Sequence, residues 1–254
     1  MTQTHHSFVN AAYSPRANDY VTSAVHATGE DLDQIEIMVR GCSTARALDL
    51  GCGGGHVSYR VAPQVAEVVA VDLSAQMLEA VTRTATERGL PNITTKQSAV
   101  ESLPLAAQHF DFVFSRFSAH HWRDFEAGLR EARRVLALSG RALFVDSVAP
   151  SAALLDSYLQ TMELLRDPTH VRNYTSPEWM AALARAGFEV ISIKPRRLRI
   201  EFGSWISRTR TPTALAEAIR LLQTGAPSEV RDHFGIEPDG SFMLDTVAFE
   251  ARPA

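Results

Sequence analysis

The sequence has few cysteines and no long run of apolar residues. Its two cysteines, Cys42 and Cys52, are too few for a disulfide framework or for a structural zinc site, so we expect no metal. No apolar stretch approaches the roughly 18 residues that suggest a membrane-spanning helix. The first ten residues, MTQTHHSFVN, lack the basic segment and apolar run of a signal peptide. We therefore expect no membrane contact and a reducing, cytoplasmic environment.

Positive charge is also scarce. Lys96 and Lys194 are the only lysines, and 25 Lys and Arg against 29 Asp and Glu give a formal net charge of −4. The overall field of such a chain does not attract nucleic acid. With 45% hydrophobic and 21% charged residues, the 254 residues have enough apolar material for one large domain, or for one domain with an elaborated lid.

Short apolar runs alternate with helical stretches in the first 150 residues. The runs predict strands at 45–50, 67–72, 92–97, 110–115 and 142–148. Between them the pattern predicts helices at 56–62, from the cap Ser74 to Gly89, and at 124–136. Strands that are apolar on both faces and joined by helices indicate a parallel sheet covered on both sides. We therefore predict a Rossmann-like, doubly wound α/β fold with its ligand site beyond the carboxyl ends of the strands.

The pattern changes after Pro150. It predicts helices at about 152–166, from 176 to about 187 and from 211, with a sixth strand at 188–193 and a last strand at 241–250. The prediction is thus a seven-stranded, mostly parallel sheet with an antiparallel last strand and a helical cap. We treat residues 1–254 as a single domain. Its parts are an N-terminal cap segment at 1–30, a core at 31–150, cap insertions around strand six at 151–235 and the last strand at 236–254.

The most specific motif is ALDLGCGGG at 47–55. It follows a predicted strand and opens a helix, as a nucleotide-binding turn requires, and its glycines let the backbone approach a ligand closely. Asp72 ends the next strand, where an acid can accept hydrogen bonds from ribose hydroxyls. A dinucleotide fingerprint would need a third glycine at position 56, which is His56. That departure counts against a nicotinamide-dependent oxidoreductase.

Four segments together resemble a known family. They are LDLGCGGGHVS at 48–58, AVDLSAQML at 70–78, ESLPLAAQHFDFVFSRFSAHHWRD at 101–124 and LREARRVLALSGRALFVD at 129–146. The chain resembles class I methyltransferases that use S-adenosylmethionine (SAM), and among them the ubiquinone/menaquinone C-methyltransferase-like group, methyltransferase type 11. The resemblance covers about residues 8–250. It implies that 31–150 binds SAM, and that a methyl group passes to a small-molecule acceptor with release of S-adenosylhomocysteine.

The resemblance also implies which residues contact SAM. They are Tyr20, Asp49, Gly51, Cys52, Gly53, Asp72, Leu73, Met77, Ala99, Val100 and Ser115. Asp72 would hold the ribose hydroxyls, Tyr20 the carboxylate, and the backbone carbonyl of Ser115 the amino group. Ala99 stands where many relatives carry an acid, so backbone or water must accept the hydrogen bond of the adenine amino group. Met77 lies on an apolar helical stripe, so it can pack in the core as well as on the adenine.

Candidate acceptor contacts follow the fourth strand and lie in the cap. His120 is the candidate general base or substrate contact, because the loop after strand four borders the acceptor in this fold. The alternative is that His121 and Trp122 pack the helix entry. The further candidates are His121, His170, Arg172, Tyr174, Trp205 and Arg208. For these residues a solvated loop is the alternative.

Two other functions compete with a small-molecule methyltransferase. One is an RNA methyltransferase, for which Lys194, Arg196, Arg197 and Arg199 form a basic strip. A solvated strand face explains the strip more simply, since the chain is acidic and carries no RNA-binding motif. The other is a non-catalytic SAM-binding protein with a blocked pocket. The sequence leaves open the acceptor, the atom that is methylated and the oligomeric state.

Overall fold

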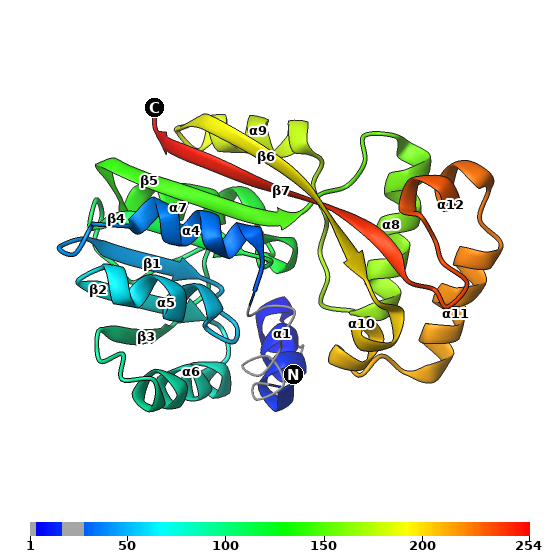
Figure 1. Ribbon diagram of the computed structural model, residues 1–254, viewed down its shortest axis with the longest axis horizontal. Helices are drawn as coiled ribbons and strands as arrows, with labels where there is room; N and C mark the ends of the chain where they lie inside the picture. Colours follow the sequence, from blue (N-terminus) through cyan, green and yellow to red (C-terminus); the bar gives the residue numbers. More distant parts are fainter. Residues whose placement is uncertain (1–3, 17–27) are drawn as a thin grey trace.

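The computed structural model describes residues 4–16 and 28–254, which fold around a seven-stranded sheet (Figure 1). The strands are β1 (Arg46–Leu50), β2 (Glu67–Asp72), β3 (Ile93–Gln97), β4 (Phe110–Arg116), β5 (Leu136–Ser147), β6 (Phe188–Ile200) and β7 (Phe242–Pro253). Their order is β3-β2-β1-β4-β5-β7-β6. β7 runs antiparallel to both of its neighbours, and the other adjacent pairs are parallel. The predicted fold class is thereby confirmed.

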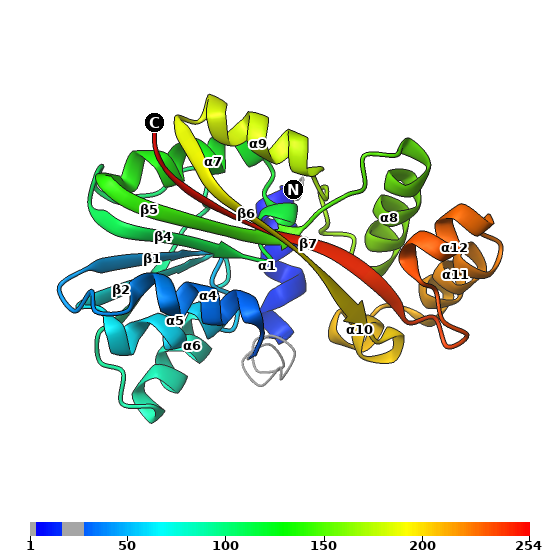
Figure 2. The same cartoon turned by 45° about the horizontal axis from the view of Figure 1, so that its top comes forward.

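Helices cover both faces of this sheet (Figure 2). On one face lie α7 (Phe125–Val135) and α9 (Ser176–Arg185), and on the other α4 (Glu30–Val39), α5 (His56–Val61) and α6 (Ala75–Glu87). Successive side chains of a strand point to opposite faces, so Leu48 and Leu50 pack under α7 and α9 while Ala47 packs under α4 and α5. The sheet therefore needs apolar residues at nearly every position of its central strands.

Side-chain caps set the starts of three of these helices, and the sequence predicts one of the caps, Ser74. The Ser74 hydroxyl accepts a hydrogen bond from the backbone N–H of Met77 at 3.1 Å, and Ser74 caps α6. Asp124 caps α7 in the same way. Thr175 and Glu178 form a reciprocal capping box at the start of α9. These local contacts fix where each helix leaves the edge of the sheet that carries the ligand site.

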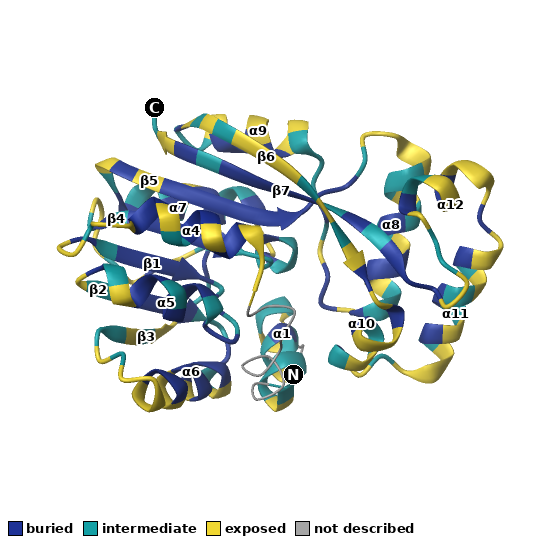
Figure 3. Cartoon of the chain, viewed as in Figure 1, coloured by how far each residue is buried: buried dark blue, intermediate teal, exposed yellow. Residues whose placement is uncertain are grey.

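β6 and β7 continue beyond the sheet and build a cap. Their outer halves pair Arg196–Ile200 with Phe242–Thr246. Four helices pack around them: α8 (Ala153–Arg166), α10 (Phe202–Arg208), α11 (Thr213–Thr224) and α12 (Ser228–Phe234). A separate apolar cluster that includes Trp205, Ile219 and Phe234 fills this cap. Figure 3 shows buried residues on the inner side of the cap and exposed residues on its outer side. The cap thus has its own hydrophobic core on a shared pair of strands.

The long strands correct two sequence predictions. Strand six was expected at 188–193 but extends to Ile200, because an edge strand tolerates Pro195 and outward-facing cations that a central strand would not. Strand five was expected at 142–148 but begins at Leu136, with an irregular register opposite β4. The sequence pattern also missed α10 and α12, which are only seven residues long. Short helices carry too few turns for an apolar period to show.

An N-terminal helix that the sequence pattern also missed closes the arrangement. α1 (His5–Tyr13) and η1 (Ser14–Arg16) lie between the core and the cap (Figure 1). The Tyr13 hydroxyl donates to the Asp167 carboxylate of the cap at 2.5 Å, and Ser14 hydrogen-bonds Ser74 of the core at 2.9 Å. α1 is therefore held from both sides, directly over the carboxyl ends of the strands.

Candidate functional site

A cavity of about 680 Å³ lies at the carboxyl ends of the strands, between the sheet, α1 and the cap. This volume is within the range of small-molecule sites, roughly 300–1,000 Å³. The glycine turn and the loops after β2 and β4 line its core side, and β6, β7, α8 and α10 line its cap side. The position agrees with the sequence prediction for a doubly wound sheet.

The glycine turn gives the cavity its floor. Gly51 has a φ of +65°, and a Cβ there would lie 1.8 Å from the Ser118 hydroxyl oxygen. Ser118 is fixed in turn, because it accepts a hydrogen bond from the Trp122 indole at 3.0 Å. Gly53 has a φ of +49°, and a Cβ there would meet no atom within 4 Å. Backbone at Gly53 is thus open to a ligand, whereas Gly51 is required by close packing.

Asp72 lines the cavity at the end of β2 with both carboxylate oxygens held. One accepts from the backbone N–H of Gly53 at 3.0 Å and the other from that of Ser74 at 2.9 Å. Burial raises the pKa of this carboxyl group above its ordinary value, although these hydrogen bonds oppose the shift. Each oxygen retains a lone pair for a further donor, such as a hydroxyl group.

Asp49 lies at the base of the turn. Its carboxylate accepts from the backbone N–H of Ser58 at 3.1 Å and from the Ser58 hydroxyl at 2.7 Å. Gly55 cannot cap α5 with a side chain, so Asp49 satisfies a free N–H of the first turn in its place. Burial raises the pKa of Asp49 to about 6. The aspartate thus connects β1 to α5 and holds the turn between them.

The structure brings most of the predicted cofactor contacts to the cavity. The lining includes Asp49, Gly51, Cys52, Gly53, Asp72, Leu73, Met77 and Val100. It does not include Ala99, although its neighbours Ser98 and Val100 are present, and it does not include Ser115, which is buried in β4 between β1 and β5. Tyr20 lies outside the described residues.

Sequence reasoning missed several lining residues. From α1 come His6, Val9, Asn10 and Tyr13, and from the core loops Ser98, Glu101, Arg116 and Ser118. A signal for α1 was present, since Thr4 precedes the segment HHSFVNAAY and caps it by accepting from the Ser7 N–H. Nothing in the local sequence shows that this helix lies over the cavity, because that placement depends on distant partners.

His120 is part of a buried ion pair that the sequence did not reveal. Its Nδ1 lies 2.6 Å from Oδ1 of Asp146, at the end of β5. The other Asp146 oxygen accepts from the backbone N–H groups of Ala119 at 2.8 Å and His120 at 3.3 Å. A carboxylate with these donors holds Nδ1–H of the imidazole, and leaves Nε2 as the nitrogen that can meet a ligand. His120 lines the cavity, whereas Asp146 lies behind it.

Charges around His120 decide its proton affinity. Burial alone would lower the pKa of His120, but the charge of Asp146 and its hydrogen bond outweigh burial and raise that pKa above 6.5. His121 differs, since burial and then the neighbouring His120 lower its pKa to about 4. His120 thus holds a proton more readily than a free imidazole does, whereas His121 stays neutral.

His121 and His170 have structural partners. His121 lines the cavity and lies 3.0 Å from the Tyr13 hydroxyl and 3.2 Å from the Thr169 carbonyl, so it connects α1 to the loop after α8. His170 is absent from the lining, and its Nε2 lies 3.1 Å from the Gln160 side-chain oxygen. Burial lowers the pKa of His170 as well.

The remaining acceptor candidates divide into two groups. Trp205 and Arg208 line the cap side of the cavity. Arg172 and Tyr174 do not, because Arg172 pairs with Asp156 at 3.1 Å and Tyr174 stacks on Phe125 with ring centroids 4.1 Å apart. Those two residues stabilise the loop between α8 and α9 and do not reach the cavity.

The basic strip is largely paired. Arg196 contacts Glu30 at 3.4 Å, and the guanidinium groups of Arg197 and Arg199 contact Asp245 and Glu237.

Within residues 4–16 and 28–254 no helix is long and apolar enough to span a bilayer. The same residues hold no group of three side chains suited to binding a metal ion.

Comparisons with known proteins agree with this geometry. Residues 48–144 match the family model described as a methyltransferase domain. The uncharacterised protein YafE of Escherichia coli (strain K12) is 45% identical, over 80% of this chain and 99% of that protein. The uncharacterised methyltransferase YcgJ of Bacillus subtilis (strain 168) is 35% identical, over 88% of each chain. The crystal structure of YcgJ superposes with a TM-score of 0.83 over 89% of this chain and 99% of that one, at 32% identity.

A more distant relative bears on the predicted subgroup. The ubiquinone/menaquinone biosynthesis C-methyltransferase UbiE of Rhizobium meliloti (strain 1021) is 27% identical over 56% of each chain. Its match is shorter than those of YafE and YcgJ, which extend over the cap sequence as well. The resemblance inferred from the four sequence segments is confirmed.

Packing at the glycine turn gives a stability prediction. Gly51 and Gly89 have nearly the same φ, +65° and +67°, but a Cβ at Gly89 would meet no atom within 4 Å. Gly89→Ala should therefore lower the free energy of unfolding by only about 1–2 kcal/mol, which is the cost of the left-handed backbone conformation for a residue with a Cβ. Gly51→Ala adds the clash with Ser118. Urea denaturation should therefore show that its free energy of unfolding falls by roughly 3 kcal/mol. Equal losses would contradict the packing argument, and Ser118→Gly should restore part of the stability of Gly51→Ala.

Proposed function

This chain belongs to the class I methyltransferases, and we propose on that basis that it transfers a methyl group from SAM to a small-molecule acceptor. S-adenosylhomocysteine would be released. One observation carries the proposal: a single cavity connects the glycine turn and Asp72 to a chamber lined by His120 and Trp205. Cofactor and acceptor would thus share one enclosed space, as direct transfer requires. Because Cys42 and Cys52 are both free, we propose a reducing compartment, the cytoplasm.

The charges of the core side suit SAM. The lining residues between His6 and Trp122 include five carboxylates and one arginine: Glu30, Asp31, Asp49, Asp72, Glu101 and Arg116. SAM carries a positive sulfonium and a positive ammonium group, which a negative wall stabilises. The open backbone at Gly53 can accept the close approach of the methionine part. These features of the chain support SAM as the proposed cofactor.

Individual residues would divide the binding of SAM among them. Asp72 would accept hydrogen bonds from the ribose hydroxyls, because its carboxylate is held at the cavity wall by Gly53 and Ser74. Leu73 and Met77 would pack on the adenine. Tyr20 remains the proposed contact for the carboxylate. Ala99 and Ser115 take no part in this proposal, since neither lines the cavity.

His120 would act as the general base. SAM supplies an electrophilic methyl group, so the acceptor needs an available electron pair. Where the acceptor is a phenol, an enol or an acidic carbon, Nε2 of His120 would take its proton as the new bond to carbon forms. Asp146 would stabilise the resulting imidazolium through Nδ1. The cap would exclude water and align the reacting atoms. A neutral amine would need no base.

Binding measurements test the cofactor first. We expect isothermal titration calorimetry to give micromolar affinity for SAM and S-adenosylhomocysteine and none for NAD. Asp72→Ala should weaken both by about ten- to a hundredfold, because two charge-assisted hydrogen bonds to ribose are lost. Asp232→Ala, an exposed acid in α12, is the matched control and should bind normally. Binding of NAD alone, or of none of the three, would contradict the proposal.

The ion pair of His120 predicts a titration. With ¹³C-labelled histidine, the ring of His120 should titrate by NMR with a midpoint above 6.5, since its pKa is raised. Asp146→Asn removes the negative charge that offsets the effect of burial on the pKa of His120, so the midpoint should fall below 6.5. His120→Gln assigns the signal. A midpoint that does not move in Asp146→Asn would show that Asp146 does not position or charge the imidazole.

Turnover separates a catalytic from a structural role for His120. With an acceptor found in a screen, His120→Ala should lower kcat by about a hundredfold to ten-thousandfold, the usual contribution of a general base. The affinity for SAM should change little, because the proposed contacts to SAM come from Asp72, the glycine turn and their neighbours and not from the His120 ring. An equal loss of turnover and SAM affinity would instead indicate that His120 holds the loop after β4 in place.

A further inference from the structure

The two sides of the cavity carry opposite charge. The lining residues from Ser147 to Thr246 include one carboxylate, Glu163, and four arginines, whereas the core side has an excess of carboxylates. The arginines are Arg166, Arg196, Arg197 and Arg208. A cationic cofactor explains a negative core side, but it does not explain why the described lining of the cap is positive. The difference points to the charge of the acceptor.

Two of these arginines belong to pairs between elements. Arg196 contacts Glu30 and Gln34 of α4, and Arg197 contacts Asp245 of β7 at 2.9 Å. These contacts explain their presence as links between the cap strands and their neighbours. The inference therefore depends on the other two, Arg166 at the end of α8 and Arg208 at the end of α10.

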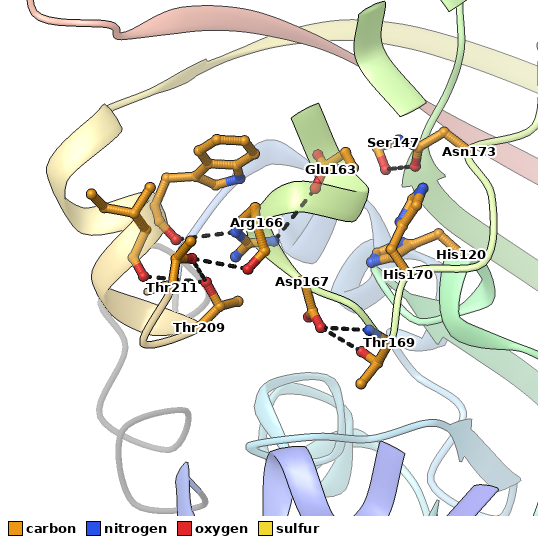
Figure 4. Close-up of polar contacts among 12 residues, drawn as sticks. His120, Ser147, Glu163, Arg166, Asp167, Thr169, His170, Asn173, Thr209 and Thr211 are labelled. Atoms are coloured by element: carbon orange, nitrogen blue, oxygen red, sulfur yellow. Dashed lines mark hydrogen bonds and ion pairs between the residues drawn. The ribbon is translucent and has the colours of Figure 1, made fainter. Parts of the chain in front are cut away.

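Arg166 is held rigidly within the cap. Its Nε donates to the Trp205 carbonyl at 3.1 Å, and its Nη1 lies 3.5 Å from the Glu163 carboxylate (Figure 4). The guanidinium also lies 5.0 Å from the centroid of the Trp205 ring. A guanidinium fixed in this way loses little conformational entropy when it binds an anion.

Glu163 is the one carboxylate among the described lining residues of the cap side. Its side chain is 8% exposed, and burial raises its pKa. The positive charges of Arg166, His120 and Arg208 oppose that shift. Glu163, Arg166 and Arg208 together line the cavity with a positive balance.

Apolar side chains surround this charged group. Leu198 and Ile200 of β6, Trp205 of α10 and Leu244 of β7 line the same side of the cavity. In surroundings of this kind a charge-assisted hydrogen bond is stronger than in water. The cap side thus offers apolar side chains and two guanidinium groups, and His120 lines the same cavity.

We propose that the methyl acceptor is a small organic carboxylate with an apolar body. Its carboxylate would contact Arg166 and Arg208, each of which keeps its contacts within the protein, and the body would pack on the apolar side chains that β6 and β7 contribute to the lining. The atom that is methylated would lie next to His120. This inference rests on the proposed function and names its substrate class.

Matched probes test the charge of the occupant directly. Saturation-transfer NMR would measure the binding of benzoate, of the neutral isostere benzamide and of phenyl phosphate, with S-adenosylhomocysteine at saturation. We expect benzoate to bind at least about tenfold more tightly than benzamide, since a hydrogen bond to a charged group raises the affinity by about this factor or more. Arg208→Gln and Arg166→Gln should abolish the preference, and Arg208→Lys should retain part of it.

Arg199→Gln is the control, because Arg199 pairs with Glu237 at the surface and does not line the cavity. It should keep the preference for benzoate, and melting curves of every variant would show that the fold is intact. Equal binding of benzoate and benzamide, or no binding of benzoate at millimolar concentration, would overturn the proposal. Tighter binding of phenyl phosphate would overturn the carboxylate assignment. Failure of S-adenosylhomocysteine to bind, with benzoate still bound, would refute the methyltransferase and not the anion site.

Discussion

Burial of the Asp146 carboxylate is the constraint on which the site depends. An ionised carboxylate inside a protein is stable only when donors surround it, and Asp146 receives N–H groups from Ala119, His120 and Ser147 together with the His120 ring. Those donors come from the loop after β4 and from the end of β5. The need to solvate one charge thus fixes the path of the loop and the orientation of the imidazole.

The opposite charges of the two cavity walls follow from different parts of the sequence. Asp49 and Asp72 of the core side lie near the carboxyl ends of β1 and β2, where they hold the glycine turn. The arginines of the cap side lie on α8, α10 and the edge strand β6. The negative wall thus includes residues that hold the core together, whereas the positive wall belongs to the cap.

Sequence reasoning identified the core side of the cavity more easily than the cap side. The strand, turn, helix and acid around Gly51 and Asp72 are local in sequence, and their chemistry can be read from spacing alone. Asp146 could not be found in this way, since it is 26 residues from His120 and reads as the polar end of a buried strand. Arg172 and Tyr174 were predicted as acceptor contacts because their loop is polar and aromatic, yet they contact Asp156 of α8 and Phe125 of α7 and do not line the cavity. Where a side chain points depends on tertiary contacts that no single segment contains.

The place of β7 has a consequence for how the chain folds. β7 follows every other strand in the sequence, yet it lies between β5 and β6, which do not pair with each other. During synthesis β6 therefore has no partner strand, and the edge of β5 stays open, until residues 242–253 have left the ribosome. The sheet and the cap core then close in one step, through contacts that are far apart in sequence and slow to form. Until that moment two long strand edges are exposed to other chains, so this is the stage at which the nascent protein is most prone to aggregate.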